Sequence, residues 1–184
     1  MKRLKYLFLF FILLGLDQGT KYLARAELME GSSLPIIPKV LKLFYVENYG
    51  AAWGLFSGRA SLLSFITLVS VVALIYCFFM IPSETKYTPL RVIIVGIAAG
   101  AIGNNLLDRI IHGYVIDFIY FELIDFPVFN VADMYIVIGT ALFALLILLK
   151  YKEEDFEFMK RKKVETMQAH KQEDSVDQEE RLDQ

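Results

Sequence analysis

Two aspartates stand alone among apolar residues in the second half of the chain. Asp117 lies in the run YVIDF at residues 114–118, and Asp133 ends the run FNVAD at residues 129–133. A single aspartate in such a place serves as a helix N-cap or contacts lipid headgroups. Two carboxylates held close together cannot both ionise at low cost, so they share one proton. The ionised carboxylate then takes a proton from water while the protonated one polarises a carbonyl, so the pair predicts acid–base catalysis.

Charged side chains also interrupt the first apolar segment. Asp17 and Lys21 are four residues apart, so on a helix they share a face and can pair. Ionisable groups in or beside hydrocarbon are costly and indicate function by default. A structural ion pair that keeps the helix end hydrated is the alternative for these two residues.

The run NYGAAWG at residues 48–54 combines an amide with small residues. Gly50 permits close approach of the backbone, and the side chain of Asn48 can both donate and accept hydrogen bonds. The alternative is an ordinary turn before a helix, with Trp53 as an anchor at the membrane interface.

A third polar group lies in the run GAIGNNLLDR at residues 100–109. Its small residues are suited to tight contact between helices. Asn105 and Asp108 are three residues apart and share a helix face. The guanidinium of Arg109 can clamp a carboxylate, a phosphate or a lipid headgroup.

Four apolar segments are able to hold these residues in a membrane, where a spanning helix needs about 20 mostly apolar residues. They are residues 6–16 with a continuation past Asp17, residues 61–81 without any charge, the stretch between Arg91 and Asp108, and residues 128–149. The mean hydropathy of +0.47 agrees with this assignment. We therefore predict an all-α membrane protein with four transmembrane helices.

Charge is distributed unevenly along the 184 residues. The last 35 residues hold 11 of the 21 acidic residues, and the preceding part is far less charged. We expect a four-helix domain over residues 1–150 and a charged cytoplasmic tail over residues 151–184 that is disordered, because the tail has almost no apolar periodicity. The net charge of -2 and the single cysteine exclude a nucleic-acid binder driven by positive charge and a disulfide scaffold.

Lysine and arginine indicate the orientation of the four segments. Thirteen of them lie at the N-terminus, in the 82–91 loop and in the tail, whereas five lie on the other side. Both termini are therefore predicted to be cytoplasmic, and residues 24–60 and 108–127 to face outward. Within residues 24–60, the runs LPIIP (34–38) and LKLFYV (41–46) are typical of short strands, which predicts a small extracytoplasmic β layer between helices one and two.

The N-terminal segment has an alternative interpretation as a cleaved signal peptide. A basic start precedes the apolar residues 6–16, and ARA at residues 24–26 matches a small-x-small cleavage site. The charges of Lys21 and Arg25 fit poorly just before a cleavage site. A transmembrane helix is therefore the favoured interpretation.

Taken together, five polar runs resemble the bacterial lipoprotein signal peptidases, also called signal peptidase II. The runs are DQGTK (17–21), NYGAAW (48–53), GAIGNNLLDR (100–109), VIDF (115–118) and FNVAD (129–133), in the order typical of that family. The resemblance covers about residues 5 to 150. One mild departure is Trp53, where the family commonly has phenylalanine.

A second departure is the doubled asparagine. In the family, Gly-Asn is usually followed by two residues and then Asp-Arg. Counting back from the Asp-Arg pair selects Asn105 as the matching residue, and counting forward from Gly103 selects Asn104. We favour Asn105, because the Asp-Arg pair also sets the eight-residue step from Arg109 to Asp117.

The resemblance implies an intramembrane aspartic endopeptidase. Such an enzyme removes signal peptides from prolipoproteins by cleaving just before a diacylglyceryl-modified cysteine. Asp117 and Asp133 match the catalytic dyad. The positions that match residues shaping or supporting the site are Asp17, Lys21, Asn48, Gly50, Asn105, Arg109, Asn130 and Ala132. The resemblance implies no metal or cofactor.

The resemblance also implies partners and a location. The partners are modified prolipoproteins and membrane lipids, without nucleic acid, and the location is the bacterial cytoplasmic membrane with the active site at its outer face. A monomer is expected because the helices can enclose the site within one chain. A proton-coupled small membrane transporter is the main alternative, but its carboxylates belong near the membrane midplane, whereas these lie at span ends. A structural envelope protein requires no such set of polar residues.

Overall fold

The computed structural model describes residues 3–50, 56 and 58–157. Four helical spans cross the molecule, as predicted, and each is long and apolar enough to traverse a membrane. Three of them are single helices, namely α1 (Leu4–Leu28), α2 (Ala60–Met80) and α5 (Val131–Leu149). The remaining span is composed of η2 (Thr85–Tyr87), α3 (Thr88–Ala101), the π-helix η3 (Ile102–Asp108) and α4 (Arg109–His112). The predicted roles of Trp53 and of residues 158–184 lie outside the described residues.

The outer surfaces of the helices are apolar. Phe8 of α1, Phe65 of α2 and Leu148 of α5 are among the large hydrophobic side chains that are exposed. Lipid chains are as apolar as these side chains, so a membrane helix gains nothing by burying them inside the protein. The composite third span is different, because most residues of its most apolar stretch are buried inside the protein.

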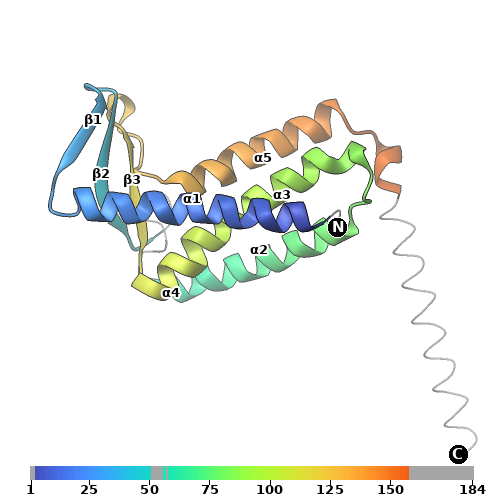
Figure 1. The fold of residues 1–184 in the computed structure, drawn as a ribbon, viewed down its shortest axis with the longest axis horizontal. Coiled ribbons are helices and arrows are strands. Elements are labelled where there is room, and N and C mark those ends of the chain that lie inside the picture. Colours follow the sequence, from blue (N-terminus) through green and yellow to red (C-terminus); the bar gives the residue numbers. More distant parts are fainter. Residues whose placement is uncertain (1–2, 51–55, 57, 158–184) are drawn as a thin grey trace, which may run out of the picture.

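A three-stranded antiparallel sheet lies at one end of the helices, beside α4 and the start of α5 (Figure 1). Its strands are β1 (Ser33–Ile37), β2 (Leu41–Asn48) and β3 (Val115–Phe121), in that order across the sheet. The first two strands agree with the predicted β layer. The third was not predicted, because its residues are nearly all apolar and carry no alternating pattern. Two short 3-10 turns, η4 (Glu122–Ile124) and η5 (Glu153–Phe156), complete the described structure.

β3 links the sheet to the helices. It pairs with β2 so that Asp117 is opposite Val46 and Val115 is opposite Asn48. The side chains of Ile116 and Phe118 in β3 pack with those of Ala24 and Leu28 at the end of α1. The strand therefore holds Asp117 at the junction between the sheet and the helical body.

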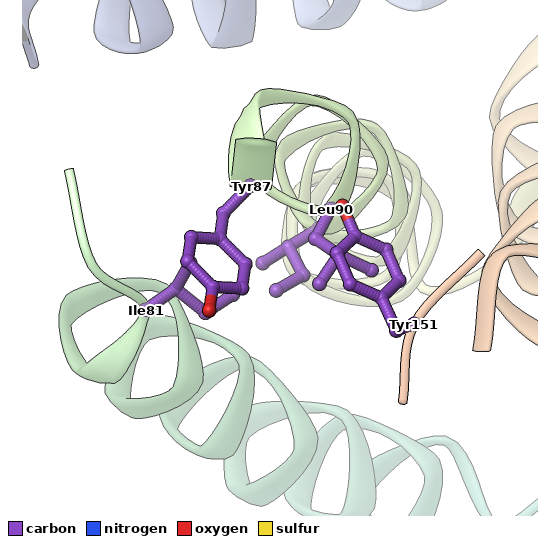
Figure 2. Close-up of a cluster of buried hydrophobic side chains, with 5 residues drawn as sticks. Ile81, Tyr87, Leu90 and Tyr151 are labelled. Atoms are coloured by element: carbon purple, nitrogen blue, oxygen red, sulfur yellow. The ribbon is translucent and has the colours of Figure 1, made fainter. Parts of the chain in front are cut away.

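A second buried cluster lies at the opposite end of the helices, near the start of the third span (Figure 2). Tyr87 and Tyr151 stack there with ring centroids 5.9 Å apart, over Ile81 and Leu90. The hydroxyl of Tyr151 donates a hydrogen bond to the backbone carbonyl of Lys86 at 2.8 Å. The first residues after 150 thus pack against the body of the protein.

The start of α1 and the turn η5 lie at the same end, away from the sheet (Figure 1). This arrangement follows from four spans that alternate in direction. Asp17 and Lys21 of α1 are 0% and 2% exposed. α1 is therefore an integral part of the folded core, which favours the transmembrane interpretation over a cleaved signal peptide.

Candidate active site

Asp117 and Asp133 come from different elements and meet at Asn130. Asp117 lies in the middle of β3, and Asp133 lies in the first turn of α5. The Nδ2 atom of Asn130 donates to Oδ1 of Asp117 at 2.6 Å, while Oδ1 of Asn130 accepts the backbone N–H of Asp133 at 3.0 Å. One fully buried side chain thus contacts both aspartates.

The helix start that carries Asp133 is a reciprocal capping box. The backbone N–H of Asn130 donates to Oδ2 of Asp133 at 3.1 Å, and the Asn130 side chain caps the helix in return. The N-terminal position also places the Asp133 carboxylate at the positive end of the helix dipole. Local sequence therefore sets the position of Asp133.

Asp117 has a second amide donor. The Nδ2 atom of Asn48, at the end of β2, donates to Oδ2 of Asp117 at 2.8 Å. Asp117 is 2% exposed. Burial, together with repulsion from Asp133, raises the pKa of Asp117 to about 7, although the hydrogen bonds from Asn48 and Asn130 oppose this rise. This carboxyl can therefore hold a proton near neutral pH.

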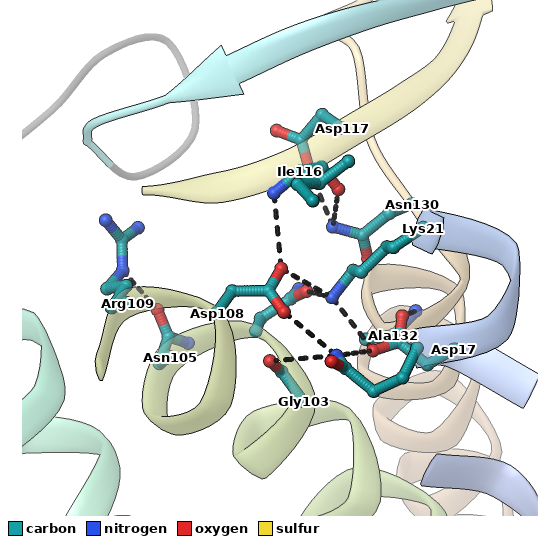
Figure 3. A network of polar contacts seen from close by, with 12 residues as sticks. Asp17, Lys21, Gly103, Asn105, Asp108, Arg109, Ile116, Asp117, Asn130 and Ala132 are labelled. Atoms are coloured by element: carbon teal, nitrogen blue, oxygen red, sulfur yellow. Dashed lines mark hydrogen bonds and ion pairs between the residues drawn. The ribbon is translucent and has the colours of Figure 1, made fainter. Parts of the chain in front are cut away.

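A buried ionic cluster centred on Lys21 lies close to Asp117 and Asn130 (Figure 3). The Nζ atom of Lys21 is 2.8 Å from Oδ2 of Asp17 and 2.9 Å from Oδ2 of Asp108. All three side chains are at most 2% exposed. The Nε2 atom of Gln18 donates to Asp108 at 2.9 Å and to Asp17 at 3.0 Å. The predicted pair of Asp17 and Lys21 is thus present, with a second carboxylate added.

The ionic cluster holds the surrounding backbone in place. Oδ1 of Asp17 accepts the N–H of Ala132 at 3.0 Å, one residue before Asp133. Oδ2 of Asp108 accepts the N–H of Ile116 at 3.2 Å, one residue before Asp117. Each buried carboxylate therefore fixes the residue that precedes one aspartate of the pair.

Arg109 lies on the other side of the site, at the start of α4. Its Nε donates to Oδ1 of Asn105 at 3.1 Å, and its Nη2 donates to the carbonyl of Gly50. Oδ1 of Asn48 accepts the N–H of Gly50 at 2.9 Å, which holds that turn against the sheet. The Nη1 atom of Arg109 is buried and has no hydrogen-bond partner among the described residues.

These groups border a cavity of about 1040 Å³. Its polar wall includes both aspartates, Asn48, Asn104, Asn105 and Arg109. Its other wall is apolar and includes Phe126, Phe129, Met134, Val137 and Ile138. An apolar cleft with a few convergent polar groups is the usual form of a ligand site. Among the described residues, no group of three or more His, Cys, Asp or Glu side chains could hold a metal ion.

Each residue that the sequence analysis placed in the site contributes to this arrangement. Three further residues were not assigned to it there: Gln18 and Asp108, which complete the cluster around Lys21, and Asn104. Asn104 donates from Nδ2 to Oδ1 of Asp133 at 2.7 Å, whereas Asn105 contacts Arg109. The spacing of Asp108 from Arg109 was visible in sequence, but its pairing with a lysine 87 positions earlier was not.

Comparison with known proteins identifies the family to which this chain is similar. The profile of the family described as "Signal peptidase (SPase) II" matches residues 9–149. The lipoprotein signal peptidase of Clostridium acetobutylicum is 40% identical over 142 residues, covering 76% of this chain and 90% of that protein. That of Caldanaerobacter subterraneus subsp. tengcongensis is 44% identical over 136 residues, covering 73% and 90%.

The fold agrees as well. A bacterial membrane enzyme structure determined by the in meso method at 1.9 Å resolution superposes with a TM-score of 0.68 and 34% sequence identity, covering 80% of this chain and 94% of that chain. Multi-pass membrane architecture is thus shared with a solved enzyme. These matches favour the peptidase over the transporter alternative. The chain belongs to the signal peptidase II family of aspartic peptidases, whose activity is that of a lipoprotein signal peptidase.

Proposed function

We propose that Asp117 and Asp133 form the catalytic dyad and activate a water molecule for attack on a peptide bond. The observation that carries this proposal is the position of Asn130, whose side chain contacts both aspartates beside an apolar cavity. Repulsion between the carboxylates favours a state in which they share one proton. That state contains both a base and an acid, as peptide hydrolysis requires.

In this mechanism the ionised carboxylate takes a proton from water as the water oxygen bonds to the carbonyl carbon. The protonated carboxyl donates to the carbonyl oxygen, so a neutral tetrahedral intermediate forms. The carbon–nitrogen bond then breaks while the dyad gives its proton to the leaving amine and takes one from a hydroxyl of the intermediate, which becomes the carboxylic acid product. The pair ends with one shared proton again, so the cycle closes.

The substrates are proposed to be prolipoproteins, because the relatives of this chain are lipoprotein signal peptidases. Cleavage falls just before a cysteine that carries diacylglyceryl. The acyl chains fit the apolar wall formed by residues such as Val137 and Ile138, while the peptide follows the polar wall. The Nη1 donor of Arg109, which has no partner in the described part of the chain, is suited to a backbone carbonyl of the substrate. No metal or cofactor takes part in this proposal.

Substituting each aspartate tests the dyad. Asp117→Asn and Asp133→Asn are expected to lower cleavage of a purified diacylglyceryl-modified prolipoprotein by about 100- to 10,000-fold, because each removes one acid–base group. Asp155→Asn is the matched control, since Asp155 lies in η5 at the far end of the helices. Near-wild-type cleavage by either dyad variant, with the control equally active, overturns the proposal.

We further propose that the site lies at the outer face of the bacterial cytoplasmic membrane, that residues 151–184 form a cytoplasmic tail, and that the enzyme works as a monomer. In a Cys77→Ser background, Arg59→Cys at the sheet end is expected to react in intact cells with a membrane-impermeant maleimide. Glu84→Cys, at the other end, is expected to stay unlabelled. The reverse pattern contradicts the orientation. A molar mass in detergent corresponding to two or more chains contradicts the monomer.

A further inference from the structure

The two consecutive asparagines lie inside the π-helical segment Ile102–Asp108, between the α-helices α3 and α4. A π-helix joins residues i and i+5, so each hydrogen-bonded ring holds one residue more than in an α-helix. Segments of this kind are rare and frequently occur at functional sites. Here the expanded turn faces the candidate active site.

Asn104 bridges the ionic cluster and Asp133. Its Oδ1 accepts from Nζ of Lys21 at 2.7 Å, and its Nδ2 donates to Oδ1 of Asp133 at 2.7 Å. Lysine only donates hydrogen bonds, so the amide oxygen must face Lys21 and the amide nitrogen must face Asp133. Asn104 is 3% exposed, so water has little access to these contacts.

Asn105 makes a different set of contacts. Its Oδ1 accepts from Nε of Arg109 one turn later at 3.1 Å, and its backbone carbonyl accepts from the hydroxyl of Ser64 at 3.0 Å. None of these partners touches the bridge from Lys21 to Asp133. The two amides therefore serve the two sides of the same cavity.

The π-helical turn makes this division possible without disturbing the residues that follow. In a regular α-helix, one added residue rotates every later side chain by about 100°. In this structure Asp108 contacts Lys21 and Arg109 contacts Gly50. Such a rotation would break both contacts. The wider turn accommodates an extra residue while these contacts remain.

We propose that Asn104 is a positioning residue, which is held by its hydrogen bond from Lys21 and in turn holds Asp133. Asn105 separately orients Arg109 toward the substrate. The π-helical turn supplies both amides. This inference rests on the proposed function, since it assigns Asp133 to the dyad and Arg109 to substrate contact. Asn104 acts on the chemical step, whereas Asn105 acts on substrate binding.

Steady-state kinetics with a diacylglyceryl-modified prolipopeptide separate the two roles. Asn104→Ala is expected to lower kcat by about 10- to 100-fold, the effect of one hydrogen bond to a charged group, with KM within about twofold of wild type. Asn105→Ala is expected to raise KM by about 10-fold, with a smaller change in kcat. Asn104→Asp is isosteric but replaces the donor by a carboxylate, so it should lose as much kcat as Asn104→Ala. A role in packing alone would leave Asn104→Asp active.

Deleting Asn104 tests the contribution of the π-helical turn. The shortened helix has a single asparagine, which cannot contact both Asp133 and Arg109. Either kcat therefore falls or KM rises relative to wild type. Thermal unfolding in detergent identifies variants that fold. The inference is overturned if folded Asn104→Asp or the deletion variant keeps wild-type kcat and KM, or if the loss in Asn104→Ala appears only in KM. A failure of the proposed function is distinct, because Asp117→Asn and Asp133→Asn would then still cleave.

Discussion

The Nδ2 atom of Asn130 lies 2.6 Å from Oδ1 of Asp117, and this contact joins the sheet to the start of α5. The same side chain caps α5 through the backbone N–H of Asp133 at 3.0 Å. A cap that serves only the helix needs no second partner. The arrangement therefore couples the position of one aspartate to that of the other.

Two substitutions at Asn130 separate its role as a helix cap from its contact with Asp117. Asn130→Ala is expected to lower the free energy of unfolding by about 1–2 kcal/mol and to reduce cleavage. Asn130→Ser keeps a capping oxygen, but its hydroxyl is too short to reach Asp117. We expect this variant to unfold near the wild-type temperature and still cleave poorly. Wild-type kcat in Asn130→Ser would show that the contact with Asp117 is dispensable.

Lys21 neutralises two buried carboxylates, so its removal should be costly. Lys21→Met leaves Asp17 and Asp108 without their cation, and we expect a loss of about 3–5 kcal/mol in the free energy of unfolding. Lys42→Met is the matched control, since Lys42 pairs with Glu122 in a partly exposed ion pair worth at most about 1 kcal/mol. Unfolding in denaturant measures both. Equal losses in the two variants would contradict the role of the buried cluster.

α3 and α5 approach closely at Gly100. A Cβ atom at this position would lie 2.5 Å from the backbone oxygen of Ala132, which cannot move aside as a flexible side chain can. Gly100→Ala is expected to destabilise the protein by about 1–3 kcal/mol and to displace Asp133. In Gly96→Ala, on the same helix, the nearest atom lies at 4.0 Å, so the change should be neutral or stabilising. A thermal unfolding midpoint in Gly100→Ala at or above that of Gly96→Ala would contradict this packing.

The raised pKa of Asp117 predicts a pH dependence of stability. In the folded protein Asp117 keeps its proton up to about pH 7, whereas in the unfolded chain it loses it near pH 4. The folded state binds more protons between these values, so stability falls as the pH rises through this window. Asp117→Asn should show a smaller fall in unfolding temperature between pH 5 and pH 8. The control Asp155→Asn should keep the wild-type slope, because the pKa of Asp155 is lowered and lies outside the window. An unchanged slope in Asp117→Asn would refute the assignment.

Much of the fold could be predicted from the sequence because its signals are local. A spanning helix needs a long apolar run, and a polar residue within such a run is expensive enough to stand out. This is why the sequence marks Asp17, Lys21 and Asp133 as candidate site residues. The capping box of Asn130 and Asp133 is likewise a short-range pattern.

β3 could not be predicted in this way. Its residues are almost all apolar, and it forms a strand because β2 offers hydrogen bonds from a segment some 70 residues earlier. The sequence also could not show which of the two asparagines contacts Asp133. Counting from either end of the run selects Asn104 or Asn105, and Asn105 is the favoured match to the family motif. In the structure Asn104 contacts Asp133 and Asn105 contacts Arg109.

The sequence by itself determined the four spans, the two short strands before α2, and most of the polar residues of the candidate site, because the membrane makes each costly polar group conspicuous. Only the tertiary structure decided how those groups meet: Lys21 between two carboxylates, Asn130 between two aspartates, and two neighbouring asparagines with different partners. These contacts join residues far apart in the chain. Their geometry depends on how helices and strands pack, which no local pattern of residues records.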